Sequence, residues 1–249
     1  MKRLIKQLKM RWAIRRHLAK YGGFNFKGHP IKVPQNLKLS LKNKIARETY
    51  EVAEAALIER YLQTDIPVIE LGGCIGLISS FVASKLEPDV ALLIVEANPA
   101  LIDICRHNAS LGGKRPNTRV ISKAIAYGHK TVSISITDNI HVSRVNHGDP
   151  YQGITVDATT LAQLVKLVGS PPAYTLVCDI EGAEIDLLRN DIAALENCRL
   201  AILELHPQSY QRTGHSVENL LDFAKAAGLS PIAQDGDVYA FAQLDVRSR

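Results

Sequence analysis

Acidic side chains at the ends of apolar runs are the first sign of chemistry in this sequence. Glu70 and Glu96 each close such a run, and a glycine-containing turn and a helix-like stretch lie between the two runs. Asp179 follows a third apolar run. Because open parallel sheets bind ligands beyond the carboxyl ends of their strands, the three carboxylates are expected to meet at one edge of a sheet.

The turn that begins at Glu70 reads Glu-Leu-Gly-Gly-Cys-Ile-Gly and is predicted to bind a cofactor. Its glycines would let the backbone approach a ligand closely. A dinucleotide pyrophosphate prefers backbone N–H groups without a nearby carboxylate, whereas S-adenosyl-L-methionine carries an ammonium and a sulfonium group that suit an acidic strand end. The spacing ExGxxxG also differs from the GxGxxG of dinucleotide-binding proteins. The predicted cofactor contacts in this turn are Glu70, Gly72, Gly73, Cys74 and Gly76.

Glu96 lies 20 positions after Gly76, where a carboxylate can accept hydrogen bonds from both hydroxyls of an adenosine ribose. NAD carries the same ribose, so Glu96 indicates that an adenosine binds but does not distinguish NAD from S-adenosyl-L-methionine. Ala124 lies just after the third strand candidate, where it could form part of an apolar bed for the adenine ring.

The fourth and fifth strand candidates end in the motifs Asp-Ile-Glu-Gly-Ala-Glu and Glu-Leu-His-Pro. Asp179, Glu181, Glu204 and His206 are therefore predicted to converge on the reacting group, with Asp179 also near the cofactor. In one interpretation Asp179 or His206 is a general base, because a neutral hydroxyl is a poor nucleophile. In the other, the four side chains bind a divalent ion that lowers the pKa of a hydroxyl; we favour the interpretation without a metal. Glu184 is expected to be a helix N-terminal acid.

Strands that alternate with helices would position these residues. Such alternation is typical of βαβ units and a mostly parallel sheet. We therefore predict a doubly wound α/β fold of the Rossmann-like type, with a mostly parallel seven-stranded sheet and an N-terminal helical extension. The strand candidates are 67–71, 90–95, 119–122, 174–178, 200–205 and 238–243, and the helix candidates are 1–20, 44–62, 75–86, 99–111, 183–189 and 217–227.

Two segments do not follow this alternation. Residues 24–43 contain two prolines and are expected to be irregular. Residues 131–136 alternate like an exposed strand, and the polar stretch 138–153 follows. Because loops of this kind carry specificity, we expect that stretch to lie at the mouth of the site and to select the acceptor.

The first 47 residues differ in charge from the rest of the chain. They hold 14 Lys and Arg and no Asp or Glu, whereas the remainder holds 16 basic and 25 acidic residues, a net charge of −9. The basic balance therefore belongs to an extension, residues 1–47, and not to the domain, residues 48–249. For this reason the charge of the whole chain does not predict a nucleic-acid-binding protein.

The predicted first helix is amphipathic. A basic amphipathic helix can lie on an anionic membrane surface as a peripheral contact, through residues 1–20. It could also contact a polyanionic glycan or another protein. The more frequent outcome for such a charge run is a solvated helix whose apolar side packs on the domain. The apolar residues that lie roughly on one face are Leu4, Ile5, Leu8 and Trp12.

The overall composition, 46% hydrophobic and 22% charged, is that of a soluble globular protein. Residues 1–20 contain no unbroken apolar run, so neither a secretory signal nor a membrane span is expected. The four cysteines have no metal-ligand spacing, and a disulfide framework is not expected. We expect the protein in the reducing cytoplasm.

Several motifs together resemble the FkbM family of methyltransferases, over about residues 45–245. They are Tyr50-Glu51, 68–76 with Ser79, Glu96-Ala97-Asn98-Pro99 with Asn108, 155–161, 179–184 and 202–206. The resemblance implies S-adenosyl-L-methionine as methyl donor and a hydroxyl acceptor, often on a sugar or polyketide. It also adds Ala97 to the cofactor contacts. The sequence departs from the family's usual Asp, Ala and Asn at Glu70, Gly73 and Cys74, and from its usual Lys at Cys178.

These observations predict an S-adenosyl-L-methionine-dependent O-methyltransferase that acts on a hydroxyl of a sugar-containing or related small-molecule acceptor. Its partners would be that small molecule or a glycan, and no nucleic acid. One alternative is an NAD-type Rossmann oxidoreductase, against which Glu70 and the missing GxGxxG argue. The other is a non-catalytic binding module that retains the methyltransferase fold.

Overall fold

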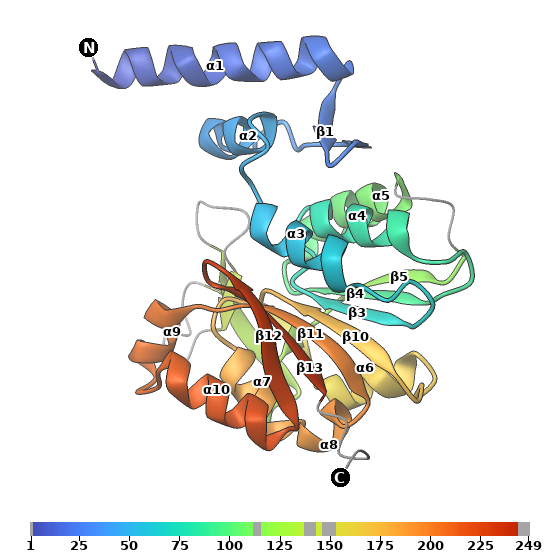
Figure 1. Cartoon of the computed structure of the whole chain (residues 1–249). Helices are drawn as coiled ribbons and strands as arrows, with labels where there is room; N and C mark the ends of the chain where they lie inside the picture. The colour runs from blue at the N-terminus through green and yellow to red at the C-terminus, as the bar shows by residue number, and fades with distance from the viewer. Residues whose placement is uncertain (1, 112–115, 137–142, 146–152, 244–249) are drawn as a thin grey trace.

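A seven-stranded sheet forms the centre of the molecule (Figure 1). The structure is a computed structural model that describes residues 2–111, 116–136, 143–145 and 153–243. The strands of this sheet are β3 (Val68–Leu71), β4 (Leu92–Glu96), β5 (Thr118–Ser122), β10 (Tyr174–Cys178), β11 (Cys198–Glu204), β12 (Leu229–Asp235) and β13 (Val238–Gln243). Their order is β12-β13-β11-β10-β3-β4-β5, and only the pairs made by β13 are antiparallel.

The strand order reverses between β3 and β10, which confirms the predicted doubly wound arrangement. From β3 the chain moves outward to β4 and β5, and it then returns to place β10 on the other side of β3. Every residue of β3, β4 and β10 is buried, as expected for strands covered on both faces. The carboxyl ends of β3 and β10 therefore lie side by side at the point where ligands bind in open α/β sheets.

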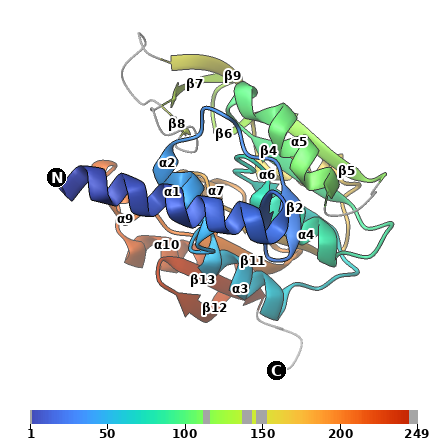
Figure 2. The ribbon, with the colours of Figure 1, turned by 90° about the horizontal axis from the view of Figure 1, so that it is seen from above.

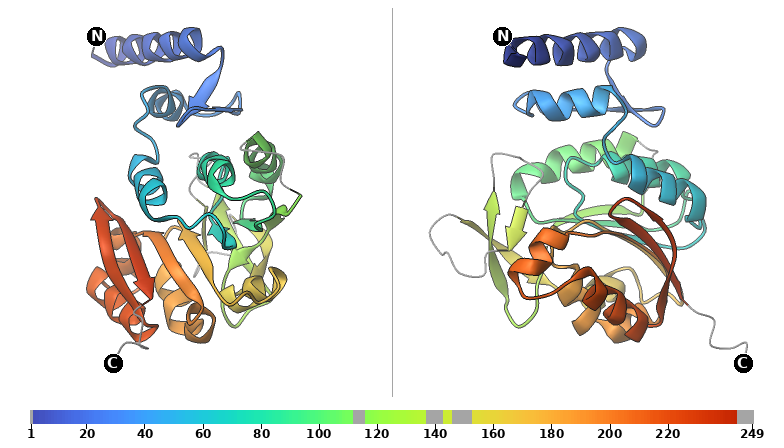
Figure 3. Two further views of the ribbon diagram at one scale, coloured as in Figure 1. Left: turned by 45° about the vertical axis from the view of Figure 1, so that its right-hand side comes forward. Right: turned by 60° about the vertical axis from the view of Figure 1, so that its left-hand side comes forward.

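Helices cover both faces of the sheet (Figures 1 and 3). On one face lie α3 (Val52–Tyr61), α4 (Leu77–Lys85) and α5 (Ile102–Leu111), and on the other lie α6 (Leu161–Leu167), α7 (Glu184–Asn190), α8 (Ile192–Leu195) and α10 (Val217–Ala226). The short helices η1 (Pro99–Leu101) and α9 (Pro207–Arg212) follow the ends of β4 and β11. Each face has its own cluster of buried apolar side chains, so the core consists of two layers separated by the sheet.

A smaller sheet follows β5. It consists of β6 (Ala124–Ile125), β7 (Thr131–Ile136), β8 (Ser143–Val145) and β9 (Gly153–Thr159), in the order β6-β9-β7-β8. The strand predicted at 131–136 is β7. Most of the stretch 138–153, which is predicted to select the acceptor, lies outside the described residues.

The extension is more ordered than the sequence predicts. It contains α1 (Lys2–Tyr21), a hairpin of β1 (Phe24–Phe26) and β2 (His29–Ile31), and α2 (Leu39–Ala46). The expectation of an irregular segment at 24–43 is therefore wrong. The hairpin is tied to the domain, because Phe26 packs edge-on against Phe81 and Asn108 binds both backbone groups of Lys32.

The predicted continuous helix at 44–62 is also wrong, because a turn at residues 47–51 separates α2 from α3. Glu48 and Glu51 adopt left-handed backbone conformations, with φ of 56° and 52°. The backbone N–H of Thr49 returns to the carbonyl of Lys44 and closes the first helix. The apolar spacing of the two short helices continues across this turn, which is why it reads as one helix.

Helix α1 forms the outermost layer of the molecule, on the far side of α2 from the sheet (Figures 1 and 2). Its buried side chains are Ala13 and His17. Leu4, Leu8 and Trp12 are 62%, 57% and 61% exposed, so the expectation that the apolar side packs on the domain is wrong. None of the helices within the described residues is both long and apolar enough to cross a membrane.

The outer strand β12 is absent from the sequence prediction. It pairs only with β13, and its register slips between Pro231 and Ala233. Ile232, at the slip, is exposed. The proline in this strand and the polar residues at its C-terminal end obscure the alternation by which a strand is recognised.

Candidate active site

A cleft opens at the carboxyl ends of β3, β4 and β10. It brings together most of the residues predicted from the two strand ends and the acidic motif. Those that line it are Gly72, Cys74, Glu96, Ala97, Ala124, Asp179 and Glu181. Glu70, Gly73, Gly76, Glu204 and His206 lie outside its lining.

Glu96 is held in place by the backbone of the glycine turn. Its two carboxylate oxygens accept hydrogen bonds from the backbone N–H of Cys74, at 2.7 Å, and of Asn98, at 2.6 Å. Burial raises the pKa of Glu96, and these N–H donors offset part of that effect. A carboxylate fixed in this way keeps lone pairs for two further donors, as the hydroxyls of a ribose would provide.

The glycines of the turn are required by the protein that packs against them. A Cβ added to Gly72, whose φ is 89°, would lie 1.8 Å from the carbonyl oxygen of Asp179. A Cβ on Gly73 would lie 2.4 Å from the side chain of Ile94, and one on Gly76 would lie 2.7 Å from the backbone of Cys105. The loop after β10, the strand β4 and the helix α5 approach the backbone of the turn, which gives these glycines a packing role in addition to the predicted contact with a cofactor.

Glu70 lies behind the turn, in a smaller cavity that also contacts Glu51, Glu54 and Asp179. One of its carboxylate oxygens accepts a hydrogen bond of 2.7 Å from the Ser79 hydroxyl, and the other is buried without a partner. Burial raises the pKa of Glu70 to about 7. The carboxylate would thus be satisfied by a donor or a cation that enters this cavity.

Asp179, Glu181 and His206 meet at the ends of β10 and β11, as predicted. The Nε2 atom of His206 lies 3.3 Å from an oxygen of Asp179 and 3.6 Å from one of Glu181. The Asp179 oxygen is buried and its geometry toward the imidazole is not that of a hydrogen bond. Burial raises the pKa of Asp179 well above its usual range, and the charge of Glu204 adds to the effect.

Glu184 has a larger role than the helix-terminal acid expected from the sequence. It is fully buried and accepts hydrogen bonds from the Tyr210 hydroxyl, at 2.9 Å, and from the backbone N–H groups of Ile180 and Gly182. The same carboxylate lies 3.1 Å from the Nδ1 atom of His206. It therefore holds both the turn that follows Asp179 and the imidazole ring.

His206 is a basic group among acids. Burial lowers the pKa of its imidazole, but the hydrogen bond and charge of Glu184, together with the charges of Glu181 and Glu204, raise it overall. Tyr210, four residues further on, contacts the same Glu184 carboxylate. In the sequence, the only sign that His206 and Tyr210 contact the same side chain is their spacing of four residues, which places them on one turn of a helix.

Two further acids were missed as site residues. Glu51 lies at the start of α3, where burial and the charge of Glu204 raise its pKa to about 7. Glu54 is buried one turn further along, and burial together with the charge of Glu51 raises its pKa well above the usual range. An acid in the first turn of a helix normally indicates a solvated helix end, so no local pattern predicts that Glu54 is buried.

The buried acids form a site that suits a cation. The unpartnered oxygens of Glu70 and Asp179 lie near other carboxylates, which leaves negative charge uncompensated at the strand ends. An ammonium or sulfonium group fits such a donor set, whereas a pyrophosphate would be repelled. The residues present therefore fit S-adenosyl-L-methionine better than a dinucleotide.

A metal ion is the other cation to consider. Within the described part of the chain, Asp179, Glu181 and His206 each offer a ligand atom, and these atoms lie within 4.8 Å of one another. Acidic groups commonly cluster in this way without an ion. The geometry therefore gives no specific support to a metal.

Known proteins resemble the chain in its fold and in its sequence profile. No curated protein matches the chain. Among solved structures, the human methyltransferase 10 domain containing protein superposes with a TM-score of 0.50 at 13% identity, covering 96% of each chain. A provisionally assigned O-methyltransferase from Klebsiella pneumoniae has a TM-score of 0.47 at 17% identity, covering 96% of this chain and 90% of the other. The ribosomal protein L11 methylase of Lactobacillus delbrueckii has a TM-score of 0.43 at 10% identity, covering 76% and 74%.

The first of these similarities supports the Rossmann-like methyltransferase fold and nothing finer. The sequence profile of the methyltransferase FkbM domain, however, matches residues 70–230, which is well over half of the chain. The match begins at Glu70 and includes Glu96, Asp179 and His206, so it covers the strand ends that form the cleft, and Tyr50 lies before it. The chain therefore belongs to the FkbM family of methyltransferases.

Proposed function

We propose that this protein is an S-adenosyl-L-methionine-dependent O-methyltransferase whose acceptor is a hydroxyl of a sugar-containing or related small molecule. The observation that carries the proposal is the pairing of two carboxylates on one cleft. Glu96 is fixed by two backbone N–H groups on one side, and Asp179 faces the same cleft with His206 beside it.

The residues at the end of β4 would hold the adenosine. Glu96 would accept hydrogen bonds from the ribose hydroxyls, and Ala97 and Ala124 would contact the adenine ring. The acids at the end of β3, Glu70 above all, would lie toward the charged end of the cofactor. When bound, the cofactor supplies an electrophilic methyl group on a good leaving group.

Asp179 is the residue best placed to take the proton of the acceptor hydroxyl. It lines the cleft, and its raised pKa makes it a stronger base than an exposed aspartate. His206 lies behind it, held at its other nitrogen by Glu184, and can stabilise the charge that Asp179 carries before the transfer. His206 and Glu184 are thus positioning residues in this proposal.

A second cavity, of about 530 Å³, supports a polar acceptor. It adjoins the cleft, because Ile125 and Ala183 line both. Its other lining side chains are rich in hydrogen-bonding groups, among them Tyr127, His129, Thr131, Ser133, Asp186 and Asn190. A hydroxyl-rich ligand needs many such partners to replace its hydration, which favours a sugar-containing acceptor over an apolar one.

Calorimetric titration of the purified protein with S-adenosylhomocysteine and with NAD tests the cofactor. We expect saturable binding of S-adenosylhomocysteine alone. This binding should be weaker in Glu96→Ala but not in Asp103→Ala, which removes an exposed acid of α5. Binding of NAD instead would favour an oxidoreductase. A search for transfer of labelled methyl groups to sugar acceptors then tests the reaction, and cofactor binding without transfer to any acceptor would favour a binding module.

A further inference from the structure

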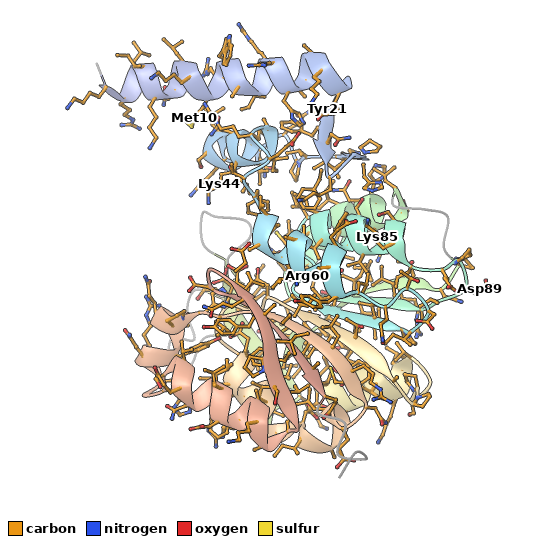
Figure 4. All side chains as sticks on the ribbon, in the orientation of Figure 1. Met10, Tyr21, Lys44, Arg60, Lys85 and Asp89 are labelled. Atoms are coloured by element: carbon orange, nitrogen blue, oxygen red, sulfur yellow. The ribbon has the colours of Figure 1, made fainter. Side chains whose placement is uncertain are left out.

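The outer face of α1 presents an apolar stripe to solvent. Leu4, Leu8 and Trp12 follow one another at intervals of four residues and are all exposed, as is Ile5. At 3.6 residues per turn, Ala13 and His17 point to the opposite side of the helix, where both are buried. Met10 lies on that inner side and faces α2 (Figure 4). The stripe is therefore not the face by which the helix is attached.

Basic side chains lie beside this stripe, since Arg11, Arg15 and Arg16 project to the same side of the helix at 3.6 residues per turn. Helix α1 has eight Lys and Arg and no acid over its 20 residues, and it is about 30 Å long. The guanidinium of Arg16 lies over the ring of Trp12, 5.6 Å from its centre. The outer side of the helix is exposed along its length, because α1 is the outermost layer of the molecule (Figure 3). A flat surface could therefore contact the helix along its length.

A groove between α1 and α2 has the same chemistry. It has a volume of about 460 Å³, and Ile5 and Met10 form its apolar part. The remaining lining side chains are Lys2, Lys6, Lys9, Asn43 and Arg47. Apolar surface bordered by several cations suits a molecule that has an acyl chain beside an anionic group.

We propose that α1 lies flat on an anionic membrane surface. Leu4, Leu8 and Trp12 would enter the region between headgroups and acyl chains, and the flanking Lys and Arg would contact lipid phosphates. A nucleic acid or an acidic glycan would use the charges but would leave the stripe in water. A second copy of the chain would bring two wholly basic helices together, which charge repulsion opposes.

Trp12 is the single tryptophan of the chain, so its fluorescence reports on this helix directly. We expect its emission to shift to shorter wavelength when the full chain meets vesicles of phosphatidylcholine with phosphatidylglycerol, and not with phosphatidylcholine alone. Vesicle flotation should show the same dependence on lipid charge. No shift with either vesicle, or equal binding to both, would overturn the proposal.

Two pairs of variants separate the charges from the stripe. Arg11→Glu with Arg15→Glu should weaken binding to the anionic vesicles at least tenfold, whereas Lys166→Glu with Lys225→Glu, on α6 and α10, should not. Leu4→Ser with Leu8→Ser should also weaken binding, whereas Ile192→Ser with Ile232→Ser, two other exposed apolar side chains, should not. Unchanged thermal unfolding would show that each variant is folded, and undiminished vesicle binding by either α1 pair would overturn the proposal.

Other partners give distinct results in the same experiments. A Trp12 shift that depends on protein concentration without vesicles would indicate a second copy of the chain. Binding to heparin with no binding to vesicles would indicate a polyanion. Either result would replace the membrane as the partner of α1. The proposed methyl transfer does not enter these measurements, so its failure would leave them unaffected.

Discussion

Helix α1 and the strand ends of the sheet both concentrate charge of one sign, but they do so under opposite conditions. In α1 the basic side chains lie in solvent, where repulsion between them is screened and costs little. At the strand ends the acids lie among buried groups, and burial raises the pKa of Glu70, Glu96 and Asp179. An exposed charged region can therefore accumulate on a surface without a partner, whereas a buried one indicates a ligand that compensates its charge.

The largest effect is expected at the centre of the buried region. Asp179→Asn should reduce methyl transfer by roughly 10²–10⁴-fold, because it removes the proposed proton acceptor. The same change should raise the thermal midpoint at pH 8, since the neutral amide avoids the cost that lifts the pKa of Asp179. Asp222→Asn, on the exposed side of α10, is the control and should change neither. Full activity in Asp179→Asn would exclude this residue as the base.

Removal of the adenosine-binding carboxylate should have a smaller effect. Glu96→Ala should weaken the binding of S-adenosylhomocysteine about 10- to 100-fold, the range expected when hydrogen bonds to one charged group are lost. It also leaves the backbone N–H groups of Cys74 and Asn98 without their acceptor, so the thermal midpoint should fall. Calorimetry and thermal unfolding measure the two effects. Unchanged affinity would mean that the cleft does not hold an adenosine at this end.

Tyr210→Phe tests the support behind the imidazole. The hydroxyl donates to buried Glu184, so its loss should lower kcat several-fold while the KM for the cofactor stays within about twofold. The pH profile of kcat should shift as well, because the altered Glu184 changes the pKa of His206. A merely structural role would lower the thermal midpoint without moving that profile.

Stability should depend on pH in the direction that the buried acids dictate. Burial raises the folded-state pKa of Glu51 and Glu70 from 4.5 to about 7. The neutral forms therefore contribute their full stability below about pH 4.5, and this contribution is lost as the pH rises through 7. The raised pKa of His206 acts in the same direction. The thermal midpoint should fall by on the order of 5 °C between pH 5.5 and pH 8. The double variant Glu51→Gln with Glu70→Gln should show a smaller fall of the thermal midpoint over the same pH range. A midpoint that rises with pH in the unmodified protein would contradict the prediction.

The smallest effect is expected from the exposed region. Removal of residues 1–21 should leave the affinity for S-adenosylhomocysteine and the pH slope of stability unchanged, because no residue of α1 lines the cleft. The exposed and buried charges would then be independent of each other. A loss of cofactor binding on truncation would instead show that α1 and the cleft are coupled.

The sequence was sufficient for six of the seven strands of the central sheet and for the position of the cleft. Runs such as 92–96 are buried on both faces, so they appear as unbroken apolar stretches, and a polar residue at their end is conspicuous. Glu96 and Asp179 were found in this way, and the structure places both on one cleft. The contact of Gly76 with α5 could not be found, because it depends on how a helix packs on the turn.

Other parts depend on tertiary contacts that no local pattern records. Glu54 lies in an amphipathic helix and is indistinguishable from a surface acid until the fold buries it. Glu184 and Tyr210 are 26 residues apart and meet only because α7 and α9 follow neighbouring strands. The turn at 47–51 depends on two glutamates in a left-handed conformation, which is rare outside glycine and asparagine.

The slip in β12 has a consequence for how the protein behaves in a crowded solution. An outermost strand normally offers a regular row of N–H and C=O groups to any other extended chain, and this is a route to aggregation. In β12 the row is interrupted, because Pro231 has no N–H and the register shifts before Ala233. The exposed Ile232 therefore lies at a point where a second strand could not continue its pairing. This edge of the sheet can thus remain uncovered without recruiting unfolded or newly made chains.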